Sequence, residues 1–146
     1  MLEKTIQTVL YSTDKNKLQI ERIHQYLSEE SYWARNIPMA IVEESIRGSL
    51  CFGVYFESKQ IGFARVITDY ASFGYLADVY ILPEHQGKGL SKELMSFIMA
   101  FPAIKNLRRF MLATKDAHDL YKAFGFSALA EPQRFMEVKA FETYTT

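Results

Sequence analysis

Two glycines flank a lysine where an apolar run gives way to a helical pattern, in Gln86-Gly87-Lys88-Gly89. The preceding run, residues 75–82, is dense in apolar and β-branched residues and is typical of a buried strand. Pro83 ends it because proline has no N–H for a sheet ladder. A strand that passes through glycines into a helix offers unpaired N–H groups and the positive end of the helix dipole to an anion. The turn therefore predicts a phosphate-binding site.

After the turn, apolar residues recur at helical spacing from Leu90 to Phe101, and Pro102 follows. We therefore expect a helix over residues 89–101. The turn has neither the GxxxxGKS/T loop of nucleotide triphosphatases nor the three-glycine dinucleotide fingerprint. The phosphate site thus belongs to neither of these two classes.

The remaining chain alternates between strand and helix patterns. We expect strands at 5–11, 50–57, 61–68, 75–82, 109–113, 126–129 and 135–141, helices at 16–28, 38–48, 89–101 and 116–124, and a loop at 102–107. The consecutive strands before residue 83 favour antiparallel pairing, whereas the βαβ unit across 89–101 favours a parallel pair. The predicted fold class is α/β (α+β), with a single mixed, mostly antiparallel sheet of about six to seven strands and helices on both faces.

Length and composition narrow the function classes. A chain of 146 residues with 49% hydrophobic content is expected to form one domain, 1–146. Lys plus Arg and Asp plus Glu number 17 each, so the broad basic field of a nucleic-acid binder is absent and nucleic acid is not an expected partner. One cysteine, Cys51, and three scattered histidines predict no disulfide and no metal site. Without a signal peptide pattern or a membrane-length apolar run, we expect a cytoplasmic protein with no membrane contact.

Taken with the segment 116–126, the turn resembles the GCN5-related N-acetyltransferase (GNAT) superfamily. The signature Gln/Arg-x-x-Gly-x-Gly/Ala of that family reads Gln86-Gly87-Lys88-Gly89-Leu90-Ser91 here. A later Leu-Tyr pair followed by Gly-Phe reads Leu120-Tyr121 and Gly125-Phe126. The resemblance covers nearly the full chain and implies the acyl-CoA N-acyltransferase fold.

The resemblance implies acetyl-CoA as co-substrate. Amides of the turn would bind its pyrophosphate, and the backbone of the central strand would pair with the pantetheine arm as an added strand does. The cofactor-binding residues implied are Val79, Tyr80, Ile81, Gln86, Gly87, Lys88, Gly89, Leu90, Ser91 and Thr114. Two of them depart from the family pattern: Ser91 replaces Gly or Ala, and Thr114 replaces an Asn common in the family.

Acetyl transfer from a thioester to an amine needs a neutral amine, a stabilised oxyanion and a protonated leaving thiolate. In the family a tyrosine matched by Tyr121 commonly protonates the thiolate, and a main-chain N–H matched by Val79 stabilises the oxyanion. By spacing alone, Tyr121 is equally an apolar-face residue of a short helix. The resemblance therefore implies catalytic roles for Tyr121 and Val79.

The general base is left open by the pattern. Asp78 is the only carboxylate of the central strand and could accept the amine proton, directly or through water. Arg65 lies mid-strand in the neighbouring hairpin arm, and an ion pair with it would make Asp78 a poor base. Some polyamine-acetylating relatives carry Glu at the position of Ala77. Asp78 is thus our candidate base, with a water chain or an already neutral amine as the alternatives.

In the family, acceptor specificity comes from the first two helices, their connection and the loop before the central strand. The matching substrate-binding candidates are Tyr32, Trp33, Arg65 and Phe73. An aromatic wall with few carboxylates would suit a modest-sized small-molecule or peptide amine, although Tyr32 and Trp33 could equally cap the edge of the core. The final expected strand, 135–141, could pair across a homodimer.

Two function classes remain after these observations. The first is an acetyl-CoA-dependent N-acetyltransferase. The second is a CoA-binding sensor or assembly domain with the fold but without catalysis, which the departures at Ser91 and Thr114 and the absence of the family Glu at Ala77 would permit. Retention of Tyr121 favours the enzyme.

Overall fold

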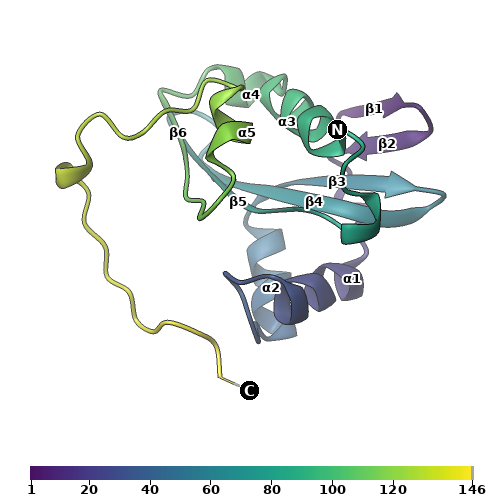
Figure 1. The fold of residues 1–146 in the computed structure, drawn as a ribbon, viewed down its shortest axis with the longest axis horizontal. Coiled ribbons are helices and arrows are strands. Elements are labelled where there is room, and N and C mark those ends of the chain that lie inside the picture. The colour runs from purple at the N-terminus through teal and green to yellow at the C-terminus, as the bar shows by residue number, and fades with distance from the viewer. Residues whose placement is uncertain (146) are drawn as a thin grey trace.

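The computed structural model describes residues 1–145, and its centre is one six-stranded sheet (Figure 1). The strands lie in sequence order across the sheet. They are β1 Glu3–Ile6, β2 Val9–Ser12, β3 Leu50–Phe56, β4 Lys59–Thr68, β5 Phe73–Ile81 and β6 Arg109–Leu112. All neighbours pair antiparallel except β5 and β6, which are parallel. The mixed, mostly antiparallel sheet predicted from the sequence is therefore confirmed.

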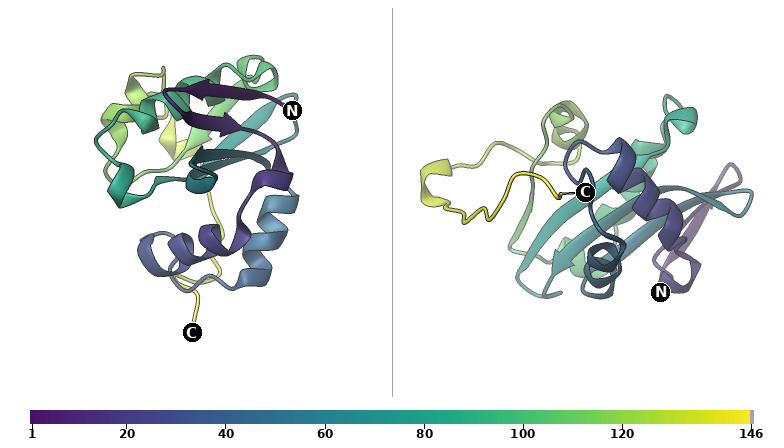
Figure 2. Two further views of the ribbon diagram at one scale, coloured as in Figure 1. Left: turned by 90° about the vertical axis from the view of Figure 1, so that its right-hand side faces the viewer. Right: turned by 90° about the horizontal axis from the view of Figure 1, so that it is seen from below.

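Helices cover both faces of the sheet (Figures 1 and 2). On one face lie α1 Ile20–Gln25, extended by a π-helical turn at Tyr26–Glu30, and α2 Met39–Arg47. On the other lie α3 Leu90–Met99, α4 Pro102–Lys105 and α5 His118–Lys122. Short 3₁₀ turns occupy Lys15–Lys17, Pro83–His85 and Pro132–Arg134. Within residues 1–145 no helix is long and apolar enough to span a membrane.

The sheet separates two clusters of buried apolar side chains. The cluster that includes Phe52 and Leu94 packs α3 against the sheet, and the cluster that includes Ile23 and Val42 packs α1 and α2. All four side chains are buried. Complete burial of such a side chain stabilises the fold by about 1.5–3 kcal/mol. The helical spacing of apolar residues in 90–101 thus reflects the buried face of α3.

The first expected strand, 5–11, is wrong in its extent, because two short strands form there. Gln7 and Thr8 have φ values of 48° and 70°, which turn β1 into β2 as a hairpin. Two-residue hairpin turns with positive φ usually carry Asn-Gly or Asp-Gly. Gln-Thr gives no such signal, so the alternation of residues 5–11 by itself predicts one strand.

Three other expectations are corrected. The expected loop 102–107 contains α4, which Pro102 begins as a favourable first helical residue. The expected strands 126–129 and 135–141 are not formed, and these residues run in a segment that stands away from the sheet (Figure 1). The composition of these residues is typical of strands, but a strand forms only where it can pair with a neighbouring strand.

Alkaline pH is expected to destabilise the protein through its buried tyrosines. Burial raises the pKa of Tyr11 to about 12 and raises the pKa of Tyr55 and Tyr80 further, because a phenolate would lose its hydration. An unfolded tyrosine titrates at about pH 10, so above that pH the folded state holds more protons than the unfolded state. Stability from these groups is full below about pH 10 and decreases as pH rises beyond it.

Urea denaturation across this range measures the effect. The free energy of unfolding should fall more steeply in the wild type than in Tyr55→Phe, since the variant lacks one such group. The Tyr55 hydroxyl has no hydrogen-bond partner among the described residues, so this control should still fold. Parallel slopes for the two proteins would contradict the assignment.

Candidate active site

The site begins where β5 and β6 diverge. They pair only from Phe73 with Arg109 to Leu76 with Leu112, whereas β5 continues to Ile81. Residues 77–81 therefore have β4 on one side and no strand on the other. Their backbone groups on the open side are available to pair with an extended ligand, as at an exposed sheet edge.

A β-bulge interrupts β5 at Asp78. The pairing register with β4 shifts between Phe63 and Arg65, and Asp78 has a φ of 56°. Positive φ is uncommon outside glycine, although Asp adopts it more readily than most residues. A bulge bends its strand and re-aims the neighbouring side chains. The divergence of β5 from β6 thus coincides with a local irregularity in β5.

Two side chains hold the Asp78 carboxylate. Arg65 Nε donates to Asp78 Oδ2 at 2.6 Å, and Trp33 Nε1 donates to Oδ1 at 2.8 Å. Arg65 also donates through Nη1 to Ser49 Oγ at 3.0 Å. The pairing of Asp78 with Arg65, one of the two alternatives raised by the sequence, is therefore present. Both carboxylate oxygens therefore already accept a hydrogen bond.

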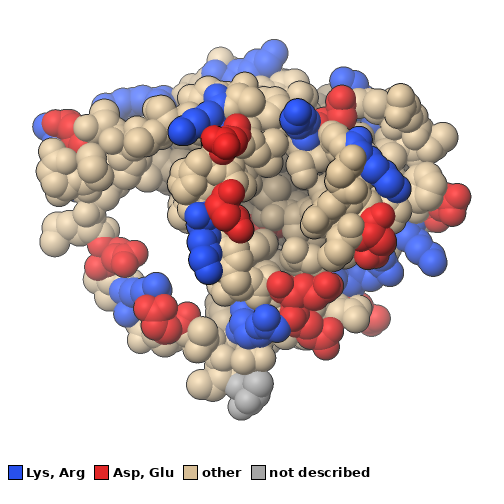
Figure 3. Space-filling model, in the orientation of Figure 1, with Lys and Arg blue, Asp and Glu red and all other residues tan. Residues whose placement is uncertain are grey.

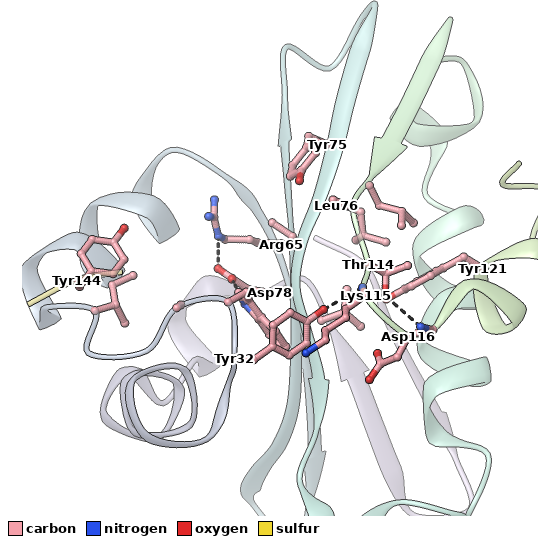
Figure 4. A pocket seen from close by; sticks show the side chains of 18 residues that line it. Tyr32, Arg65, Tyr75, Leu76, Asp78, Thr114, Lys115, Asp116, Tyr121 and Tyr144 are labelled. Carbon is pink, nitrogen blue, oxygen red and sulfur yellow. Dashed lines mark hydrogen bonds and ion pairs between the residues drawn. The ribbon is translucent and has the colours of Figure 1, made fainter. Parts of the chain in front are cut away.

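A cleft of about 540 Å³ opens at the divergence (Figure 4). It brings together most of the expected catalytic and substrate-binding residues, together with the expected cofactor-binding Thr114: Tyr32, Trp33, Arg65, Asp78, Val79, Thr114 and Tyr121. Phe73 is not among its lining residues, since it lies at the first position of β5, opposite Arg109. The side chains of Tyr80 and Ile81 are buried in the two apolar clusters, so only their backbones can serve a ligand.

Tyr121 enters the cleft from α5 (Figure 4). Its ring packs edge-to-face on Phe126 with centroids 5.9 Å apart, and only 8% of the residue is exposed. Among the described residues its hydroxyl has no hydrogen-bond partner. Burial, assisted by the nearby Tyr32 and Asp116, raises the pKa of Tyr121. The phenol is therefore neutral at physiological pH and retains a proton to donate.

Tyr32 crosses the cleft entrance. The backbone N–H of Lys115 donates to the Tyr32 hydroxyl at 3.0 Å, and the Lys115 ammonium lies 5.4 Å from the ring centroid (Figure 4). The ring of Trp33 stands edge-to-face against Tyr32 at 5.1 Å. The connection between α1 and α2 is thus tied to the loop that follows β6. The aromatic pair lines the cleft, and both residues are exposed.

Eleven of the eighteen lining residues were not predicted as site residues from the sequence, and three of them come from segments far apart in the chain. Tyr75, Lys115 and Tyr144 join the cleft from β5, the loop after β6 and the end of the described chain. The backbone carbonyl of Tyr144 accepts a hydrogen bond from Asn36 Nδ2 at 3.3 Å. No local motif marks these residues, because tertiary contacts between distant segments place them. Thr114 Oγ1 accepts the Ala117 N–H at 3.1 Å and so supports the start of α5.

The glycine turn lies at the far end of β5 and does not line this cleft. Gly87 and Gly89 both have a φ of 79°, and a Cβ at either position would meet nothing within 4 Å. Among the described residues, the N–H groups of 87–92 donate no backbone hydrogen bond. Lys88 and Lys92 flank them. The turn therefore combines open space, unpaired amides and positive charge, which fits a pyrophosphate.

Residues 20–126 match the family model for the acetyltransferase (GNAT) family. The chain belongs to this family. It is 37% identical over 132 residues to a Gibberella zeae protein assigned as an acetyltransferase, a match covering 77% of this chain and 75% of that protein. The family uses acetyl-CoA, and its members are acyltransferases. The resemblance stated from the turn and from the Leu-Tyr and Gly-Phe pairs is thereby confirmed.

Solved structures agree with this membership. A GNAT-family protein of Xanthomonas campestris, assigned as an acetyltransferase, is 49% identical, with a TM-score of 0.90 over 93% of this chain and 96% of that one. A Clostridium acetobutylicum protein, assigned as an acetyltransferase and solved with acetyl-CoA, has a TM-score of 0.65 at 14% identity, covering 90% and 94%. The second likeness supports the fold alone.

Proposed function

We propose that this GNAT protein transfers an acetyl group from acetyl-CoA to a primary amine of a small molecule or a protein. The observation that carries this proposal is the open edge of β5 at 77–81. It lies between the cleft that holds Tyr121 and the unpaired amides of 87–92. An extended pantetheine arm along that edge would connect the two, with the pyrophosphate on the turn and the thioester in the cleft.

The step we propose is direct attack by the amine nitrogen on the thioester carbonyl carbon. A C–N bond forms and the C–S bond breaks, while the Val79 N–H stabilises the oxyanion. Tyr121 donates its proton to the departing thiolate, whose basicity is close to that of a phenolate. The amine nitrogen loses one proton to solvent, and the Tyr121 phenolate takes up a proton from solvent.

The contacts of Asp78 support the two alternatives to Asp78 as the general base. To accept the amine proton, the carboxylate would have to give up Arg65, Trp33 or both. We therefore propose that the amine enters already neutral or loses its proton to water. In this account Asp78 keeps the bulge and Trp33 in place, and Tyr32 and Trp33 form a wall of the acceptor side.

An amine panel tests the proposed activity. Acetyl-CoA is incubated with the protein and individual small amines or lysine peptides, and thiol release is followed together with the acetylated product. We expect amine-dependent thiol release with at least one acceptor. If calorimetry shows that acetyl-CoA binds but no amine is acetylated, the result would instead support the hypothesis of a CoA-binding sensor or assembly domain.

Substituting Gly89 with alanine is expected to weaken CoA binding roughly tenfold. Gly89 precedes the first residue of α3 with a φ of 79°, a conformation that costs an L-residue about 1–2 kcal/mol. Relief of that strain would re-aim the amides of the turn. Calorimetric titration with CoA measures the change.

Gly48→Ala is the matched control for this substitution. Its φ is −92°, and a Cβ would meet its nearest neighbour at an ordinary 3.8 Å. The control should bind CoA as the wild type does. Equal dissociation constants for Gly89→Ala and Gly48→Ala would remove the turn from the proposed cofactor site.

A further inference from the structure

The segment 127–143 stands off the body as an arch. Before it, Phe126 packs on Phe110 with centroids 5.3 Å apart; after it, Tyr144 packs against the apolar cluster beneath α1 and α2. Figures 1 and 3 show the arch leaving the body and returning, with an opening between arch and body. The two ends are thus fixed, and between them the Phe135 ring centroid lies 5.0 Å from the guanidinium of Arg109 in β6.

The arch exposes more apolar surface than a solvated loop requires. Met136 is 98% exposed, Val138 is 100% exposed, and Phe141 is more than half exposed. Among the described residues, 136–145 donate no backbone hydrogen bond. An extended apolar segment with unpaired backbone groups is a template for pairing with another chain.

The sequence of the arch is complementary to itself. In an antiparallel pair of two copies centred on Val138, Phe135 faces Phe141 and Glu137 faces Lys139. One residue further out on each side, Arg134 faces Glu142. Opposite charges and aromatic pairs placed directly across two strands stabilise the pairing, whereas like charges oppose it.

The two faces of such a ribbon also differ. Because side chains alternate along a strand, Met136, Val138 and Ala140 from both copies share one apolar face. The other face carries the Phe135–Phe141 and Glu137–Lys139 pairs, whereas the outer Arg134–Glu142 pair lies at the two ends of the apolar face. Both of the apolar side chains that are almost fully exposed in the arch therefore fall on the same face.

We propose that a second copy of this chain covers residues 135–141, the two segments pairing antiparallel about a two-fold axis at Val138. A two-fold interface places the same patch against itself, which this segment satisfies in charge and in apolar character. The ion pairs that Lys139 and Arg134 now make, with Glu142 at 3.2 Å and Glu131 at 3.1 Å, are solvent-exposed and contribute little. They do not oppose the rearrangement.

Charge reversal across the axis tests the pairing. Sedimentation equilibrium should show the wild type as a dimer. Glu137→Lys alone and Lys139→Glu alone should each weaken the dimer by at least about tenfold, because each places like charges opposite one another twice. The double variant Glu137→Lys/Lys139→Glu should recover the wild-type dissociation constant to within about threefold.

Two further variants make the result decisive. Val138→Lys should give a monomer, since it sets two like charges on the axis, whereas Ile67→Lys, which replaces a 44% exposed residue of β4, should leave the dimer intact. A wild type that stays monomeric at every concentration would overturn the proposal. A dimer that tolerates Val138→Lys, or single reversals that the double variant does not rescue, would overturn it equally.

Discussion

Replacing Tyr121 with phenylalanine is expected to lower kcat by about 10²–10⁴-fold, the usual contribution of a positioned general acid. The phenyl ring can keep its packing on Phe126, so the loss would concern the proton and not the fold. The raised pKa of Tyr121 keeps the phenol protonated, which suits a donor to a leaving thiolate. Steady-state thiol release with a saturating amine measures kcat, and KM for acetyl-CoA should change little.

Tyr75→Phe provides a matched control, because Tyr75 lines the same cleft but comes from β5. It should retain kcat within about threefold, because Tyr75 takes no part in the proposed proton transfer. Thermal unfolding of both variants checks that neither change acts through stability. Unchanged turnover in Tyr121→Phe would remove Tyr121 from the proposed mechanism and leave it a packing residue.

Replacing Arg65 with alanine is expected to destabilise the protein by about 3–5 kcal/mol, because it leaves the Asp78 carboxylate buried without its cation. The side chains of the pair are only 16% and 9% exposed, and Nε and Oδ2 lie 2.6 Å apart. The Trp33 hydrogen bond alone does not neutralise the charge. Urea denaturation measures the free energy of unfolding.

The double variant Arg65→Met/Asp78→Asn separates the charge from the packing. Asn tolerates the positive φ of position 78 and can accept the Trp33 hydrogen bond, so much of the lost stability should return. A loss below about 1 kcal/mol in Arg65→Ala would mean that solvent reaches the pair, and it would reopen the role of Asp78 as base.

The strand, turn and helix around Gly87 and Gly89 could be predicted from the sequence because their determinants are local. Apolar runs, a proline stop and glycines with positive φ act within a few residues of the structure they form. The central sheet followed from the same kind of pattern. The hairpin at Gln7 and Thr8 did not, since its turn lacks the residues that usually mark one.

Most of the cleft could not be predicted in the same way. The bulge at Asp78 carries no sequence signal, and the contact of Tyr32 with Lys115 joins residues 83 positions apart. Tyr121 was identified only through its family motif, since its spacing is equally that of a core residue. Segment 135–141 shows a further reason why prediction fails. Its composition predicts a strand, but in our proposal the strand with which it pairs belongs to a second copy of the chain.

A crystal structure with CoA is the measurement that tests the central claim most directly. We expect the pantetheine arm along residues 79–81, the pyrophosphate on the amides of 87–92, and the sulfur within hydrogen-bonding distance of the Tyr121 hydroxyl. The Arg65–Asp78 ion pair should remain closed. A sulfur held away from Tyr121, or an arm that does not follow the open edge of β5, would contradict the account.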